Sequence, residues 1–180
     1  DDFPTTSDVN AGSSIDAWRN LEEGAYSLYG HWWSSISDEW PVDKDIYGYL
    51  YNAHAIYDER GVCPDGWHVP TDDEFKQLEI LLGMSEAEAN GGSWRGVEAG
   101  VSNKLSGNID LWNDIGNEAV FGTSGFNAVP GGKLGSHNGY NYFHLGSQIY
   151  MWTSSNLWGS SGWFRVLHQN GSIYRHHGGY

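Results

Sequence analysis

An acidic stretch offers oxygen ligands for a metal ion. Five carboxylate and amide side chains fall within nine residues of a glycine-flanked segment: Asp110, Asn113, Asp114, Asn117 and Glu118. Such oxygens are the ligands that Ca²⁺ prefers, although the D-x-D-x-D-G spacing of an EF-hand is absent. The stretch therefore predicts either a Ca²⁺ site or a solvated acidic loop, and no other cofactor is expected.

Histidine and cysteine side chains are the other residues with metal or nucleophile chemistry. His168, His176 and His177 carry the nitrogen ligands of Zn²⁺ or Cu²⁺. Adjacent strand residues point to opposite faces, so His176 and His177 make a poor pair of ligands. Cys63 is the only cysteine, and a reactive thiolate needs a cationic neighbour. Arg60 and His68 are near it only in sequence, so we expect a structural cysteine and no enzyme activity.

Aromatic and cationic side chains gather in the last third of the chain, as they do in binding surfaces. The candidates for ligand contact are Tyr150, Trp158, Trp163, Arg165, His168, Tyr174, Arg175 and His176. On a strand beginning at Gly162, Trp163 and Arg165 share one face while Phe164 and Val166 share the other. We expect the Val166 side to be core and the Trp163 and Arg165 side to be accessible. The alternative for each aromatic residue is that it fills the core.

Two capped helices are expected before these strands. Thr71 with Glu74 three residues on makes a capping box, and apolar residues continue to Leu82, which predicts a helix over residues 72–82. Gly83 can end this helix. Ser85 is expected to cap a second short helix.

The rest of the chain is expected to form short strands, turns and loops. Asn170-Gly171 is a strong hairpin signal. The aromatic segment 26–57 predicts strands and turns, 91–116 a loop, and Asp16 to Leu21 one helical turn. Late strands are expected at residues 143–145, 149–153, 162–167 and 172–176. Helices early and antiparallel hairpins late indicate the α+β class. We expect an N-terminal arm over 1–14 and a single domain over 15–180.

Composition excludes some classes of partner. The 180 residues carry a net charge of −14, which argues against nucleic acids and anionic lipid as partners. No run of 18 apolar residues is present to span a membrane. Ten Trp, eleven Tyr and 25 Gly are typical of extracellular β-rich binding domains, where aromatic rings give flat contact surfaces. Without a signal peptide or an initial Met, Asp1 is expected to begin a mature product.

Several motifs, in order, resemble the Fibrobacter succinogenes major paralogous domain family, which is found in secreted and surface proteins. They are GVCPDGWHVPTDDEF at 61–75, NLEEGAY at 20–26, YGYLYN at 47–52, NKL at 103–105, GFNAVPGG at 125–132 and WTSS at 152–155. The resemblance implies a C-type-lectin-like fold shared with formylglycine-generating enzymes. Those enzymes use two active-site cysteines, and this chain has one.

Two departures from the family pattern concern the ends of the chain. The family's first strand, near IGNQxWMxENL, and its last strand, like GFSVRCV, are both expected to be missing. The resemblance places the partner of Cys63 in that last strand.

Three functions follow as hypotheses. The first is a secreted or cell-surface binding module for a protein or glycan ligand, without catalysis. The second is a structural subunit of an extracellular filament that binds copies of itself, because a sheet without its edge strands invites strand addition. The third and weakest is a formylglycine-generating-type enzyme. In all three the core is expected to hold Trp67, Phe75, Leu78, Phe126 and Trp152.

Overall fold

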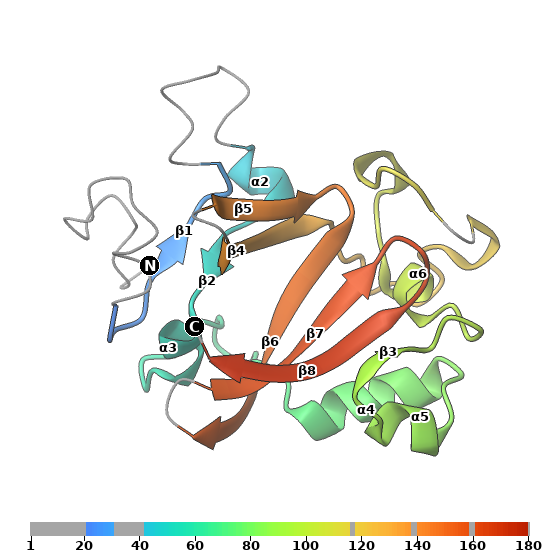
Figure 1. The fold of residues 1–180 in the computed structure, drawn as a ribbon, viewed down its shortest axis with the longest axis horizontal. Helices are drawn as coiled ribbons and strands as arrows, with labels where there is room; N and C mark the ends of the chain where they lie inside the picture. Colours follow the sequence, from blue (N-terminus) through green and yellow to red (C-terminus); the bar gives the residue numbers. More distant parts are fainter. Residues whose placement is uncertain (1–20, 31–41, 116–117, 138–139, 159–160, 180) are drawn as a thin grey trace.

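A six-stranded sheet lies at the centre of the protein (Figure 1). The computed structural model describes residues 21–30, 42–115, 118–137, 140–158 and 161–179. In spatial order the strands are β3 (Ser93–Arg95), β8 (Ile173–Gly179), β7 (Ser161–His168), β6 (Gln148–Trp158), β4 (Gly131–His137) and β5 (Tyr140–Leu145). All neighbours are antiparallel except β4 and β6, which run parallel. The α+β class is therefore confirmed, with a mixed rather than a purely antiparallel sheet.

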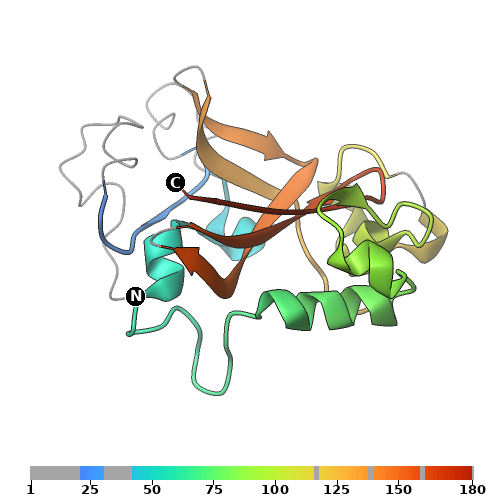
Figure 2. The same cartoon turned by 60° about the horizontal axis from the view of Figure 1, so that its bottom comes forward.

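Short helices and a two-stranded sheet surround the central sheet. The helices are α2 (Lys44–Tyr47), α3 (Ala53–Tyr57), α4 (Asp72–Leu81), α5 (Glu86–Asn90) and α6 (Val101–Leu105), with 3₁₀ turns η2 (Ile109–Leu111) and η3 (Glu118–Val120). The small sheet pairs β1 (Tyr26–Ser27) with β2 (Leu50–Tyr51). Figure 2 shows α4 running along one side of the central sheet.

The two helices predicted from capping signals are confirmed. The Thr71 hydroxyl accepts a hydrogen bond from the Glu74 N–H at 3.1 Å, and the Thr71 N–H donates to the Glu74 carboxylate at 2.7 Å. Ser85 and Glu88 repeat this capping box at the start of α5. These reciprocal bonds satisfy backbone N–H groups that the first helical turn leaves open.

Helical turns were not expected in two other segments, where the sequence prediction is correct only in part: β1 and β2 are the strands expected within 26–57. Within 26–57, α2 and α3 form because Asp43 and Asn52 accept hydrogen bonds from the N–H groups of Asp45 and Ala55. Within 91–116, β3 pairs with β8 and α6 packs into the core, so this segment is not a loop throughout. The predicted arm and the helical turn from Asp16 lie outside the described residues, apart from Leu21.

The predicted late strands are confirmed, and the predicted turn at Asn170-Gly171 joins the last two of them. The Asn170 side chain accepts hydrogen bonds from the Ser172 N–H at 3.0 Å and from its hydroxyl at 2.7 Å, and Gly171 has a φ of +93°. Only glycine adopts that conformation without strain, so this dipeptide fixes the β7–β8 hairpin.

The main core lies between one face of the sheet and helices α4 to α6. Ile149, Met151, Leu167 and Ile173 face the helices and pack with residues such as Leu105, which has no exposed surface. Among the described residues this cluster is the larger of two apolar clusters, and it fixes the sheet against the helical layer.

The core predicted from the motifs is correct in part. Phe75 is 2% exposed, while Leu78 and Trp152 are half-buried. Trp67 is 77% exposed and Phe126 is 45% exposed, so their predicted burial is wrong. Both lie in loops, where the backbone rather than the ring holds the segment: the Trp67 N–H, for example, donates to the Pro64 carbonyl.

Candidate ligand-binding site

Aromatic rings follow one another across the sheet face that is turned away from the main core. Ring centroids lie 4.9 Å apart for Trp94 and Tyr174, 6.4 Å for Tyr174 and Phe164, and 6.3 Å for Phe164 and Tyr150. His144 on β5 continues the series, 6.2 Å from Tyr150. We name these residues the aromatic face.

Strand register creates this face. Tyr150 on β6 lies opposite Val166 on β7, and Trp152 lies opposite Phe164. Since side chains alternate along a strand, the residues between them point to the helices instead. Cross-strand aromatic pairs of this kind stabilise the sheet as well as providing a ring surface.

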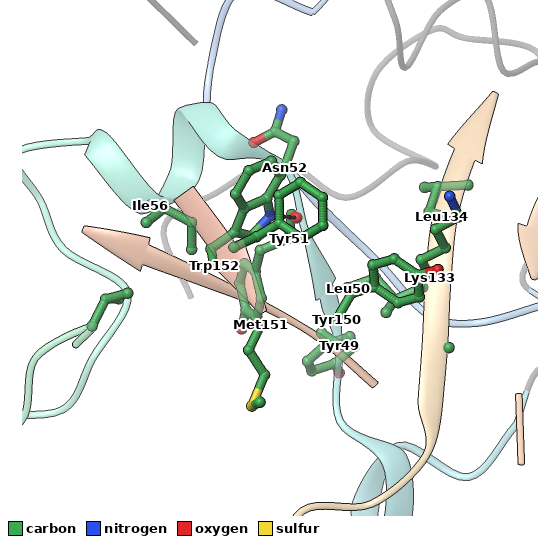
Figure 3. A pocket seen from close by; sticks show the side chains of 13 residues that line it. Tyr49, Leu50, Tyr51, Asn52, Ile56, Lys133, Leu134, Tyr150, Met151 and Trp152 are labelled. Atoms are coloured by element: carbon green, nitrogen blue, oxygen red, sulfur yellow. Dashed lines mark hydrogen bonds between the residues drawn. The ribbon is translucent and has the colours of Figure 1, made fainter. Parts of the chain in front are cut away.

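The aromatic face deepens into a pocket of about 260 Å³ where β2 and α3 approach it (Figure 3). Its walls come from β2 and the start of α3, from β4, and from β6 and β7. The lining residues are Tyr49, Leu50, Tyr51, Asn52, Ile56, Val69, Gly132, Lys133, Leu134, Tyr150, Met151, Trp152 and Phe164. Apolar and aromatic walls with a few polar groups are the usual composition of a ligand pocket.

Several polar groups of the pocket are already used within the protein. The Asn52 side chain accepts hydrogen bonds from the N–H groups of Ala25 and Ala55 and donates to the Glu23 carbonyl. The Trp152 indole N–H donates to the Tyr51 carbonyl at 3.1 Å, and the Tyr150 hydroxyl donates to Gln148 at 2.7 Å. These bonds hold the walls in place.

Lys133 supplies the cation of the pocket. Its Nζ atom lies 5.0 Å from the ring centroid of Tyr150 and 5.8 Å from that of Phe143. Burial lowers the pKa of this ammonium group. The charge of Lys133 also contributes, after burial, to the lowered pKa of His144. The pocket therefore joins ring surfaces to a partly desolvated positive charge.

The predicted ligand contacts are distributed over both faces of the sheet. Tyr150 lines the pocket. Tyr174, His168 and His176 lie on or beside the aromatic face but outside the pocket, with Tyr174 and His176 stacked at 5.3 Å. Trp158, at the end of β6, is 80% exposed and also lies outside the pocket.

The expected accessibility of Arg165 is wrong. Arg165 has no exposed surface, because it points to α4 and donates to Glu79 at 2.7 Å and to Asp72 at 2.8 Å. Arg175, 8% exposed, donates to both oxygens of Asp72, and its guanidinium lies 3.7 Å from the Trp163 ring centroid. Arg95 completes this buried network through Glu79 at 2.7 Å.

The network is built for stability rather than for ligand contact. Burial alone would raise the pKa of Asp72, but hydrogen bonds from Arg175, Lys76 and Arg165 outweigh it and hold that pKa well below its ordinary value. Every guanidinium in the network has protein acceptors. Arg165 and Arg175 therefore join the strands to α4 instead of facing solvent.

The acidic stretch is exposed where the structure describes it. Asp110, Asn113, Asp114 and Glu118 lie at the surface, and Asn117 falls outside the described residues. The Asn113 N–H donates to the Gly146 carbonyl, which attaches this segment to the β5–β6 turn. Among the described residues no three His, Cys, Asp or Glu side chains form a metal-binding group. The Ca²⁺ site stays a prediction.

The candidate metal ligands His168, His176 and His177 and the cysteine Cys63 are not among the residues that line the pocket. The rings of His176 and His177 are nearly parallel and 5.2 Å apart, while His176 packs on Tyr174 and His177 packs on Trp163 of the opposite face. Cys63 is a free, half-buried thiol in the loop before α4.

Sequence reasoning missed the β2 and β4 walls of the pocket. Tyr49 and Tyr51 belong to the aromatic alternation noted at 47–52, and Lys133 is one of only four lysines in an acidic chain. The scarcity of lysine was a usable signal. That these segments, about 80 residues apart, meet over β6 is a tertiary fact that no local pattern contains.

Comparison with known proteins supplies a family. The family model described as the Fibrobacter succinogenes major domain matches residues 6–179. The chain belongs to this family. Searches of curated proteins and of solved structures found no match. In the described part of this family member, no helix has both the length and the apolarity to cross a membrane.

Proposed function

We propose that this protein is a non-catalytic binding module of the C-type-lectin-like kind, acting outside the cell or at its surface on a glycan or protein ligand. The observation that carries the proposal is the aromatic pocket, with rings on β2, β6 and β7 around a space of about 260 Å³. Aromatic rings bind the apolar faces of ligands at low entropic cost, since they have few rotatable bonds.

The chemistry of the lining supports binding rather than catalysis. The residues that line the pocket contribute no carboxylate, imidazole, thiol or aliphatic hydroxyl. A desolvated lysine such as Lys133 can itself be a nucleophile, but no carboxylate or imidazole of the lining stands beside it as a base. The amide of Asn52, which could orient a substrate, is occupied by backbone bonds. A net charge of −14 further supports a role in an extracellular medium, where acidic surfaces aid solubility.

Pocket substitution tests the proposal. We expect the purified chain to bind at least one ligand of a glycan array, and Tyr49→Ala to weaken that binding at least about tenfold by removing a ring wall. Tyr49 is half-buried and packs on Tyr26 at 4.9 Å, so melting temperature must be measured in parallel. Trp67→Ala is the matched control, because it removes an aromatic ring that is 77% exposed and outside the pocket. Equal losses in both variants would contradict the proposal.

A filament or surface-assembly subunit is the second candidate, and the open sheet edge favours it. β3 covers the outer edge of β8 only from Ile173 to Arg175. Among the described residues, no strand pairs with that outer edge from His176 to Gly179. Exposed strand edges accept strands from other chains, which is how several fibrous assemblies form.

A further inference from the structure

Among the residues that the structure describes, Lys133 differs from the other lysines and arginines in having no acceptor. Within the described residues, each other lysine and arginine donates to a carboxylate or a carbonyl oxygen. The pairs are Lys44–Asp45, Arg60–Asp58, Lys76–Asp72, Arg95–Glu79, Lys104 with the Leu82 carbonyl, Arg165–Glu79 and Arg175–Asp72. In the same part of the chain the Lys133 ammonium group lies near the rings of Tyr150 and Phe143 and makes no hydrogen bond or ion pair. Within the described residues, this acidic protein thus has one partly desolvated cation without a counter-charge.

The remaining free polar groups of the pocket are also donors. The hydroxyls of Tyr49 and Tyr51 line it, and neither has a hydrogen-bond partner in the described part of the chain. Burial raises the pKa of Tyr51, with smaller contributions from Tyr26, Tyr49 and Cys63, so its hydroxyl stays protonated at neutral pH. An ammonium group adds three N–H donors and no acceptor. The pocket therefore offers an ammonium group that only donates and two tyrosine hydroxyls that can donate or accept.

The volume of the pocket suits one six-membered ring of a ligand. Pockets for drug-sized molecules have volumes of roughly 300–1,000 Å³, whereas this one encloses about 260 Å³. A single six-membered ring can lie against Tyr150 or Trp152, while an acceptor on that ring meets the ammonium group.

We propose that the pocket binds a ligand that has a single ring and a carboxylate group. The ring lies against the aromatic walls, and the carboxylate pairs with Lys133. This inference rests on the proposed function and specifies its ligand class. The carboxylate pairs with the Lys133 ammonium group, which lies 5.0 Å from the ring centroid of Tyr150. Charge-assisted bonds in a partly desolvated site are stronger than neutral ones. The same chemistry exists on the hexuronic acid units of acidic polysaccharides and on aromatic carboxylic acids.

Paired probes test the carboxylate. Calorimetry with the full chain compares a galacturonic acid oligomer with its methyl ester, and phenylacetate with phenylacetamide. In each pair the ring is kept and only the charge is removed. We expect at least one acid to bind the wild-type chain roughly tenfold or more tightly than its neutral partner. If the natural ligand is an acidic sugar, the difference in affinity appears in the first pair. If it is an aromatic acid, the difference appears in the second pair.

Variants of Lys133 assign the effect to that residue. Lys133→Met keeps most of the side-chain volume and should abolish the preference for the acid, whereas Lys133→Arg should keep most of it. Three results would each overturn the inference. The wild-type chain binds neither acid, it binds an acid and its neutral partner equally, or Lys133→Met leaves the preference for the acid unchanged. If neutral glycans bind and Tyr49→Ala removes their binding, the proposed function stands although the ligand class is wrong.

Discussion

At the scale of single residues, Asp72 shows how one side chain joins distant parts of the chain. Its carboxylate oxygens form ion pairs with the side-chain nitrogens of Arg165 on β7, Arg175 on β8 and Lys76 on its own helix, at N–O distances of 2.7–2.9 Å. Removing one partner from a buried set of charges leaves the others uncompensated, which costs about 3–5 kcal/mol. Asp72 also begins α4, so the same residue positions the helix and neutralises two strand arginines.

The lowered pKa of Asp72 predicts a pH dependence of stability. Because the unfolded chain takes up this proton near the ordinary pKa of 3.8, and the folded chain only well below it, the contribution is complete above about pH 5. It is lost as the pH falls from there toward the folded pKa, at up to about 1.4 kcal/mol per pH unit. Urea unfolding should therefore show the difference between wild type and Asp72→Asn shrinking between pH 5 and 2.

A neighbouring residue provides the control for this measurement. Asp73→Asn changes a side chain of α4 that is 81% exposed. We expect it to alter stability little at any pH in this range, since exposed pairs are weak. A wild-type to Asp72→Asn difference that stays constant with pH would contradict the role assigned to Asp72.

At the scale of elements, α3 is fitted closely to the β6–β7 hairpin. The Tyr57 hydroxyl of α3 donates to the Thr153 carbonyl of β6 at 3.4 Å. A Cβ atom placed on Gly162 of β7 would overlap that hydroxyl. The absence of a side chain at Gly162 is therefore what lets α3 sit against the sheet, next to the pocket wall that Ile56 provides.

This close fit predicts a coupled pair of substitutions. Gly162→Ala should destabilise the protein by about 1–3 kcal/mol, because the added methyl group overpacks the contact. Tyr57→Phe removes the overlapping oxygen and should recover part of that loss in the double variant, measured by chemical unfolding as a double-mutant cycle. Gly178→Ala is the matched control on the facing strand, where the nearest atom would be 3.6 Å away. Equal effects of Gly162→Ala and Gly178→Ala would refute the argument.

At the scale of the whole molecule, the sheet edge and the net charge act in opposite directions. The outer edge of β8 beyond Arg175, which no described strand covers, can offer backbone groups to another chain, whereas a charge of −14 repels copies from one another. Salt weakens that repulsion. Assembly, if it is the function, should therefore respond to ionic strength.

Light scattering and electron microscopy test the assembly candidate. We expect a molar mass that rises above 20.0 kDa with both protein concentration and salt. Replacing the exposed His176 and His177 together by Asp adds like charges to the edge and should suppress the rise, whereas Gln77→Asp on the exposed side of α4 should not. A constant mass of one chain under all conditions would exclude this candidate and leave the binding module.

Local signals account for what the sequence predicted correctly. The Thr71 and Ser85 capping boxes and the Asn170-Gly171 turn depend on contacts within a few residues, and each is present in the structure. Exposure is not local. Arg165 is buried because its guanidinium donates to Glu79, which lies 86 positions earlier in the sequence. The residues next to Trp67 in sequence likewise do not indicate that its ring is exposed.

The distribution of contacts along the chain has a consequence for folding kinetics. Strands β6, β7 and β8 are consecutive and joined by short turns, so their pairing closes only short loops and can form quickly. The Arg165 guanidinium, however, finds its carboxylates only when α4 arrives across loops of 86 and 93 residues. Until then the three-stranded meander holds Arg165 and Arg175 without these carboxylates on the face that must become core, and unpaired charges are costly to bury. Docking of α4 should therefore be part of the rate-limiting step, so that the meander and the helix fold as one cooperative unit.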